Sequence, residues 1–581
     1  MGGEGEIHML DEVIRGGTVI DGTGAPGVLA DVGIRDGRVV AVGDVTEDAA
    51  VTTDASGCYV TPGFIDPHTH YDAQLLWDPA ASPSTLHGVT SVVNGNCGFS
   101  LAPLRAGDAD YLRRMMAQVE GMPLPALETG IDWAWETFAE YLDRLEGNLG
   151  VNAGFMVGHC AIRRYVMGSD ATAREADEAE LDAIRNELAR ALEAGGLGFS
   201  FTWSTSHTDG EGKPVASRWA TADELEALCA ETGRHAGTTL EGIVPGCLDQ
   251  FADDEIELLA RLSAAADRPM NWNVLTVDSK VPQRIPRQLT ASDRATEIGG
   301  RVVALTMPVQ VPMNMSLLHF CGLWLLPGWR QVLDCSVEER LVALSDPEVR
   351  QTMAEGAMSP DAGVLLRLAD WATYRIGDTF SEANAGLKGR VIGDVAAERG
   401  TEPFDALLDI CVADGLRTVL WPNPPDDDDA SWAMRAELWD DPRAMIGGSD
   451  AGAHLDRMCG APYPTTWLRD CLHGRRLTSV ENAVRLMTSS PAALFGLRDR
   501  GVLRQGAVAD VVVFDPAEIG SGEAELVADL PGGSARLTAA SHGVRRVLVN
   551  GVAVVEDSAL TGATPGVVLR SGVHTDTVTA R

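Results

Sequence analysis

The sequence contains Gly63-Phe64-Ile65-Asp66-Pro67-His68-Thr69-His70, an apolar run that ends in two histidines separated by one residue. We interpret the run as a β-strand, because alternate side chains of a strand point to the same face and His68 and His70 then point to one place. Turn residues precede the run and the less apolar Tyr71-Asp72 follows it, so the pair lies at a strand end. One cation can take both imidazoles, although a bare His-x-His also fits two surface loop histidines.

With its flanks, the stretch Pro62 to His70 resembles the strand-one signature of the amidohydrolase superfamily. Other stretches resemble the N-acyl-D-amino-acid deacylase (D-aminoacylase) branch: Asn94-Gly95-Asn96-Cys97-Gly98-Phe99-Ser100-Leu101-Ala102-Pro103, Val157-Gly158-His159, Gly195-Gly196-Leu197-Gly198-Phe199-Ser200 and Gly448-Ser449-Asp450-Ala451-Gly452-Ala453-His454. The resemblance runs in order from about Asp11 to about Arg570. It implies a metal-dependent hydrolase with N-acyl-D-amino acids as substrates.

The composition is that of a soluble globular enzyme, with 45% hydrophobic and 22% charged residues in 581. A net charge of −38 argues against nucleic acid and anionic membranes as partners, because the mean field repels both. We therefore expect a small-molecule substrate, and a homo-oligomer is compatible with the sequence. The N-terminus shows no secretory signal, and the ten scattered cysteines favour free thiols in the cytoplasm.

Both ends of the chain are rich in short β-branched runs. Asp36-Gly37 near the start and Asn550-Gly551 near the end each separate two such runs, which is a strong hairpin signal. We predict one small β-sandwich assembled from residues 1–61 and 498–581, as the resemblance also implies.

The middle of the chain, residues 62–497, alternates apolar strand-like runs with amphipathic helices such as 176–193 and 222–234. This alternation predicts a parallel sheet closed as a (β/α)8 TIM barrel, so the fold class is α/β. Residues near 279–400 are read as an insertion, with a barrel element carrying extra core as the alternative.

Asp450 follows a short apolar run and two glycines, where the last barrel strand would end. The resemblance implies that it is the general base, which relays a proton from metal-bound water to the leaving nitrogen. A helix cap for the following turn is the alternative. Cys97 alone reads as a buried core residue, but the resemblance implies that it binds zinc.

The sequence departs from the branch at two strand ends where the resemblance implies histidine ligands. Thr239-Leu240-Glu241-Gly242 and Met270-Asn271-Trp272-Asn273-Val274 stand there instead. Glu241 would serve as an oxygen ligand, and Asn273 would be a weak one. A rearranged site that recruits His159 or His207, or a site without catalytic metal, are the alternatives. We favour one zinc ion rather than two, with ligands drawn from His68, His70, Cys97, Glu241 and Asp450.

Four residues are predicted to contact the substrate: His159, Ser200, His207 and His454. The three histidines follow predicted strands and Ser200 lies at the end of one, at the barrel end where substrate contacts form. Arg457 and Arg218 are weaker candidates for a salt bridge to a substrate carboxylate. The plainer alternatives are a satisfied barrel histidine for His159, an exposed loop histidine for His207 and a strand-end residue that satisfies backbone groups for Ser200.

The expected function is hydrolysis of the amide bond of an N-acyl amino acid in the D configuration. Hydrolysis of a cyclic amide or lactone is the first alternative, because the same barrel and metal would serve either reaction. A catalytically degraded barrel that binds a small acyl ligand is the second. The two missing histidines favour that second alternative, and the retained His68, His70, Cys97 and Asp450 oppose it.

Overall fold

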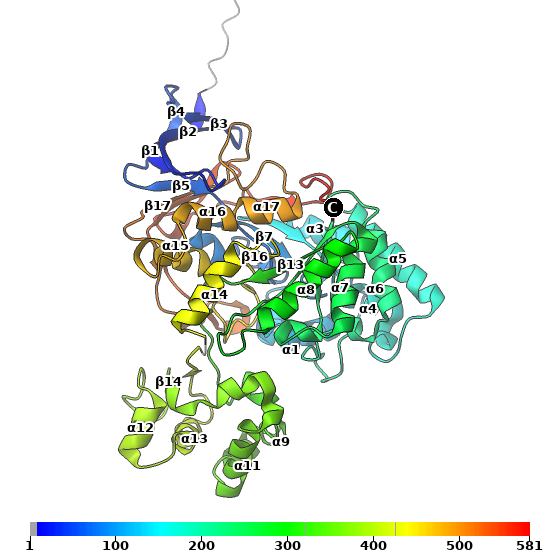
Figure 1. Cartoon of the computed structure of the whole chain (residues 1–581), viewed down its shortest axis with the longest axis vertical. Helices are drawn as coiled ribbons and strands as arrows, with labels where there is room; N and C mark the ends of the chain where they lie inside the picture. Colours follow the sequence, from blue (N-terminus) through cyan, green and yellow to red (C-terminus); the bar gives the residue numbers. More distant parts are fainter. Residues whose placement is uncertain (1–8, 320, 425) are drawn as a thin grey trace, which may run out of the picture. The chain divides into compact units, whose positions relative to one another are not determined.

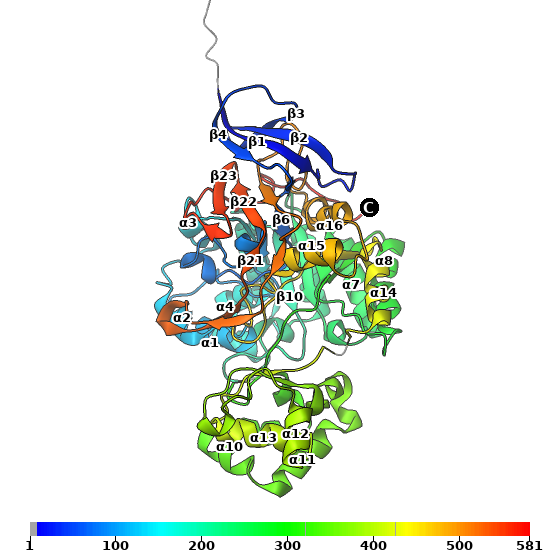
Figure 2. The same cartoon turned by 90° about the vertical axis from the view of Figure 1, so that its left-hand side faces the viewer.

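The computed structural model describes residues 9–319, 321–424 and 426–581 (Figures 1 and 2). The described chain forms two compact units. The first combines Met1–Val311 with Asp429–Arg581, and the second is Pro312–Asp428. Among the described residues, no helix has both the length and the hydropathy that crossing a bilayer requires. All ten cysteines are free thiols.

One nine-stranded sheet of the first unit takes strands from both chain ends, blue and red in Figures 1 and 2. Its order is β24-β23-β22-β17-β5-β1-β2-β3, with β4 paired to β1. The strands are β1 (Leu10–Val19), β2 (Val28–Arg35), β3 (Arg38–Gly43), β4 (Ala49–Asp54), β5 (Tyr59–Pro62), β17 (Val511–Phe514), β22 (Val544–Val549), β23 (Val552–Glu556) and β24 (Ala559–Leu560). The hairpins predicted at Asp36-Gly37 and Asn550-Gly551 are confirmed, because β2 pairs with β3 and β22 with β23.

Two parallel sheets make up the interior of the first unit, in the orders β25-β8-β7-β6 and β16-β13-β12-β11-β10-β9. Their strands are β6 (Phe64–Asp66), β7 (Val89–Asn94), β8 (Asn152–Phe155), β9 (Val157–Gly158), β10 (Gly198–Thr202), β11 (Thr239–Ile243), β12 (Pro269–Trp272), β13 (Arg301–Thr306), β16 (Ala444–Ile446) and β25 (Val568–Leu569). Most of these strands are buried along their whole length, as expected for parallel strands covered on both faces.

Consecutive helices lie side by side on the outside of the second parallel sheet (Figure 1). They are α4 (His159–Met167), α5 (Glu178–Glu193), α6 (Ala222–Thr232), α7 (Asp253–Ala266) and α8 (Arg284–Glu297). The helix α5 begins at a capping box, in which Asp177 and Glu180 each accept a bond from the other's backbone nitrogen. Ile184 and Leu188 then bury its apolar stripe. The two helices predicted over 176–193 and 222–234 are confirmed as α5 and α6.

The second unit is mainly helical and has its own hydrophobic core, in which Trp329, Trp371 and Phe404 pack together. Its α-helices include α9 (Arg330–Leu333), α10 (Val337–Ala343), α11 (Pro347–Ala357), α12 (Ile392–Arg399) and α13 (Pro403–Ala413). Part of the segment assigned to an insertion from the sequence, α8 and β13, lies in the first unit. The physical reason is that this helix and strand continue the strand–helix alternation.

Candidate metal centre

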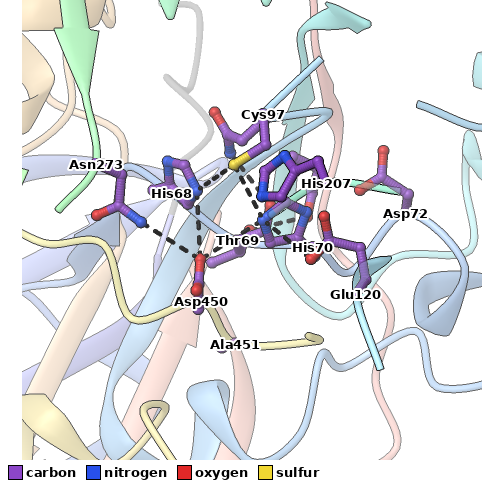
Figure 3. Close-up of polar contacts among 12 residues, drawn as sticks. His68, Thr69, His70, Asp72, Cys97, Glu120, His207, Asn273, Asp450 and Ala451 are labelled. Atoms are coloured by element: carbon purple, nitrogen blue, oxygen red, sulfur yellow. Dashed lines mark hydrogen bonds and ion pairs between the residues drawn. The ribbon is translucent and has the colours of Figure 1, made fainter. Parts of the chain in front are cut away.

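His68 and His70 follow β6 and point to the same side, as strand alternation predicts (Figure 3). The backbone between them is held on both flanks: Thr69 N donates to Val93 O at 2.9 Å, and His70 N donates to Ala451 O at 2.8 Å. The Thr69 hydroxyl donates to Val93 O at 2.8 Å. Both imidazoles are buried, so the end of β6 fixes them between β7 and the loop that follows β16.

Cys97 and Asp450 approach both imidazoles at the Nε2 atoms. Cys97 Sγ lies 3.4 Å from His68 Nε2 and 3.9 Å from His70 Nε2. Asp450 Oδ1 lies 3.3 Å and 3.6 Å from the same two nitrogens. The donor atoms of His68, His70 and Cys97 all lie within 4.8 Å of one another. The structure therefore brings these four sequence-predicted residues together.

The sequence did not predict a fifth side chain at this cluster, the carboxylate of Glu120. It follows α1 (Ala109–Val119), and its Oε2 lies 3.7 Å from His70 Nε2 (Figure 3). The only signal in the sequence was a single acid between apolar neighbours at the end of an amphipathic helix. That pattern is common on surface helices, so it did not mark a site.

Glu241 lies on β11 and supports Cys97 through the backbone. Its Oε2 accepts a hydrogen bond from Cys97 N at 2.7 Å, and its Oε1 is buried with no hydrogen-bond partner among the described residues. Asn273 donates from Nδ2 to Asp450 Oδ1 at 3.4 Å. The two strand ends that depart from the family pattern thus contact Cys97 and Asp450 respectively.

Three residues of the site have positive φ: Cys97 at 56°, Asp450 at 56° and His454 at 49°. A non-glycine residue in this region costs about 1–2 kcal/mol of folding free energy. Backbone strain of this kind gathers at functional sites, where the surrounding structure holds the residue in place. They are three of thirteen non-glycine residues with positive φ among the described residues, so the site is identified by its side-chain distances and not by strain.

The electrostatics of the cluster favour a cation. Burial raises the pKa of Glu120 to about 7 and that of Glu241 to about 8, although the charge of His70 opposes both shifts. Burial lowers the pKa of His70, but Glu120 and Asp450 outweigh it and raise the pKa to about 9. Burial would raise the pKa of Asp450, but His68 and His70 hold it well below its ordinary value. The site therefore holds several buried carboxyl groups close together, and a bound divalent ion would stabilise their charged forms.

The predicted substrate histidines His207 and His454 lie near this cluster. His207 Nδ1 is 2.9 Å from Thr202 Oγ1, and burial, followed by the charges of His454 and His70, lowers the pKa of His207 to about 3. Burial, followed by the charge of Arg457, lowers the pKa of His454 to about 4, and its Nδ1 has no partner among the described residues. Both rings are therefore neutral at pH 7 and able to donate or accept a hydrogen bond.

Ser200 and His159 make other contacts. Ser200 Oγ accepts from Gly98 N at 3.1 Å and donates to Gly95 O, so it supports the loop that carries Cys97. The two ring nitrogens of His159 face Ser217 Oγ at 3.0 Å and Glu224 Oε1 at 2.9 Å. Among the described residues, no hydrogen bond or ion pair joins either side chain to His68 or His70.

The donor set fits a zinc ion. Ligand atoms about 2.1 Å (N, O) or 2.3 Å (S) from a tetrahedral zinc lie about 3.4–3.6 Å from one another. The two Nε2 atoms lie 3.3 to 3.9 Å from Cys97 Sγ and Asp450 Oδ1, and His70 Nε2 lies 3.7 Å from Glu120 Oε2, so the longer separations exceed a hydrogen bond. The buried, unpartnered Oε1 of Glu241 is a further acceptor without a donor.

Comparison with known proteins gives one family. A sequence model of the Amidohydrolase family matches residues 51–555. The chain is 30% identical to a D-aminoacylase of Alcaligenes xylosoxydans xylosoxydans over 97% of this chain and 99% of that enzyme. It is also 30% identical to an N-acyl-D-aspartate deacylase of the same organism, over 97% of this chain and 95% of that enzyme.

A solved structure of the N-acyl-D-glutamate deacylase of Bordetella bronchiseptica, complexed with zinc and a phosphonate inhibitor, superposes with a TM-score of 0.63. It is 27% identical and covers 97% of this chain and all of that one. The amidohydrolase resemblance drawn from His68, His70, Cys97 and Asp450 is thereby confirmed. On both sequence and structure, the chain belongs to the amidohydrolase family.

Proposed function

We propose that the protein is a metal-dependent amidohydrolase that cleaves the amide bond of N-acyl-D-amino acids. One observation carries the proposal: the buried donor atoms of His68, His70 and Cys97 cluster together, and the Asp450 carboxylate lies 3.3 and 3.6 Å from the two Nε2 atoms. The 30% identity to a D-aminoacylase over 97% of this chain supports the substrate class. The retained donor set argues against a degraded barrel that only binds an acyl ligand.

We infer that the bound metal is zinc, as one ion rather than two, held by His68, His70 and Cys97 with Asp450 and Glu241 beside them. When bound, the ion supplies Lewis-acid polarisation of the amide carbonyl and lowers the pKa of a water molecule. The two histidines and Cys97 span one compact set of donors. This compactness supports one ion rather than two.

Asp450 is the proposed general base. Its carboxylate is ionised at neutral pH, because His68 and His70 hold its pKa well below the ordinary value. It can therefore accept a proton from the attacking water and pass it to the leaving nitrogen. The hydrogen bond from Asn273 to Oδ1 fixes the direction of the carboxylate.

We propose that His207 and His454 contact the substrate from the two loops that reach the centre. Arg457 and Arg218 are the cationic candidates for its carboxylate. The Arg218 guanidinium donates only to the carbonyl oxygens of Thr205 and His207 among the described residues. The contacts of Ser200 and His159 favour a supporting role in place of the substrate contact expected from the sequence.

We further propose that the two parallel sheets close as a (β/α)8 barrel. The strands β8 and β9 follow one another in the chain and belong to different sheets, and a parallel bridge from Thr69 to Ala451 connects the segments beyond β6 and β16. Both breaks between the sheets are thus spanned. The boundaries 1–61, 62–497 and 498–581, cytoplasmic location and a homo-oligomer stay predictions.

Removing the metal is expected to abolish amide hydrolysis, and zinc is expected to restore it. The test dialyses the protein against a chelator, adds back zinc stepwise and follows release of the free amino acid from N-acetyl-D- and N-acetyl-L-amino acids. Recovery that saturates near one zinc per chain, with the D substrates preferred, would support the proposal. Full activity in metal-free protein would contradict it, and faster turnover of cyclic imides or lactones would point to the other hydrolase class.

A further inference from the structure

Glu120 is a buried carboxylate whose role is not explained by its own surroundings. Its side chain is 4% exposed, and it occupies the C-cap position of α1. Among the described residues, its carboxylate makes one ion-pair contact, with His70 Nε2 at 3.7 Å, and the charge of Arg457 also acts on it. That separation is too long for a hydrogen bond.

The position is unfavourable for a negative charge on two counts. Burial removes the water that would solvate the carboxylate, and no hydrogen bond from the described residues replaces that water. The C-terminal end of a helix also carries partial negative charge, which disfavours an acid there. A cation close to Glu120 would remove both penalties.

The direction of the carboxylate shows where that cation would lie. Three atoms able to bind a metal lie close to His70 Nε2. They are Asp450 Oδ1 at 3.6 Å, Glu120 Oε2 at 3.7 Å and Cys97 Sγ at 3.9 Å. Figure 3 shows the three side chains turned toward this nitrogen. These separations are up to about 0.3 Å longer than the roughly 3.4–3.6 Å between ligands of one tetrahedral zinc, so a small inward movement of each side chain would let them share one ion.

We propose that Glu120 is an oxygen ligand of the metal centre and makes up for a histidine that this chain lacks at the ends of β11 and β12. The inference rests on the metal centre of the proposed function. In the proposed function all metal ligands follow or belong to β-strands. The present proposal adds Glu120, which follows helix α1. The mixed set of two imidazoles, a thiolate and carboxylates suits zinc.

The local structure fixes Glu120 relative to Asp450. Glu120 O accepts a hydrogen bond from His454 N at 2.5 Å, so the two ligand-bearing loops are joined through their backbones. Gly121 has a φ of 58°, and a Cβ there would lie 2.3 Å from Arg457 Nη2 and 3.1 Å from His454 Cα. The positive φ and the short approach to the His454 backbone both favour glycine at this position.

The test compares Glu120→Gln with the intact protein after metal removal. The change keeps the volume of the side chain and removes its charge. Cobalt(II) and zinc affinities are measured by competition with a chromogenic chelator, and the visible spectrum of the cobalt-loaded protein reports its ligand set. The control is Glu187→Gln, which removes another buried carboxylate, on α5, that pairs with Arg190 at 3.2 Å.

We expect Glu120→Gln to weaken metal binding by more than the roughly 10–100-fold that loss of a residue outside the ligand set costs, and to alter the cobalt spectrum. Glu187→Gln should match the intact protein in both measurements. An unchanged cobalt spectrum in Glu120→Gln would overturn the proposal. Circular dichroism of each metal-free variant checks that it has folded.

A second measurement needs no variant. Zinc-loaded crystals of the intact protein locate the metal by its anomalous signal, and a Glu120 carboxylate oxygen about 2.0–2.2 Å from it would support the proposal. A Glu120 carboxylate beyond this distance would overturn the proposal. Zinc bound by Glu120 in a protein without deacylase activity would refute the proposed function alone, and deacylase activity with Glu120 away from the zinc would refute this inference alone.

Discussion

Replacing Asp450 by asparagine is expected to lower kcat for N-acyl-D-amino acid hydrolysis by about 10²–10⁴-fold, the usual contribution of a general base. Asparagine keeps the size of the side chain and one oxygen, but it cannot accept a proton. His68, His70 and Cys97 remain in the variant, so most of the bound metal should remain too. The measurement is steady-state kinetics together with metal content per chain.

Two further variants separate the roles. His68→Ala removes a donor that contacts both Cys97 and Asp450, so it should lose metal as well as activity. Asp440→Asn is the control. It changes an exposed aspartate directly after helix α14 (Asp429–Trp439) and should leave both the metal content and the activity unchanged. Wild-type kcat in Asp450→Asn would remove Asp450 from the proton path. Recovery of that variant by excess zinc would make Asp450 a ligand and not a base.

The sequence predicted those parts of the site that local geometry determines. Alternation along a strand was enough to place His68 and His70 on one side, and the turn residues before Asp450 were enough to place it at the end of β16. The hairpins at Asp36-Gly37 and Asn550-Gly551 were predictable for the same reason, since two residues fix the turn.

The remaining parts depend on contacts between distant segments. Glu120 is not marked by any local pattern, because its proximity to His70 comes from the path of the chain after α1. The ring of His159 is satisfied by Glu224, 65 residues later, which no strand-end argument reveals. Glu241 was expected as a metal ligand, and its bond to Cys97 N is a tertiary contact between β11 and the loop after β7. Spacing in the sequence does not encode such distances.

A large effect on stability is expected from Asp510, which joins the terminal sheet to the parallel strands. Its carboxylate accepts from Arg500, from Asn550 N at 2.8 Å and from Asn152 Nδ2 at 3.2 Å, and its backbone oxygen accepts from Gly63 N at 2.9 Å. Arg500 and Asp510 are each 5% exposed. Asp510→Asn leaves the Arg500 charge buried without its counter-ion, so the free energy of unfolding should fall by about 3–5 kcal/mol.

The measurement is urea unfolding followed by tryptophan fluorescence. Glu211→Gln, which breaks the solvent-exposed pair of Glu211 with Lys213, serves as the matched control and should leave the unfolding midpoint in place, since water screens such pairs. An unchanged unfolding midpoint in Asp510→Asn would mean that the Arg500–Asp510 ion pair does not stabilise this junction. If the midpoint falls but zinc affinity is unchanged, the junction stabilises the fold without setting the geometry of the metal centre.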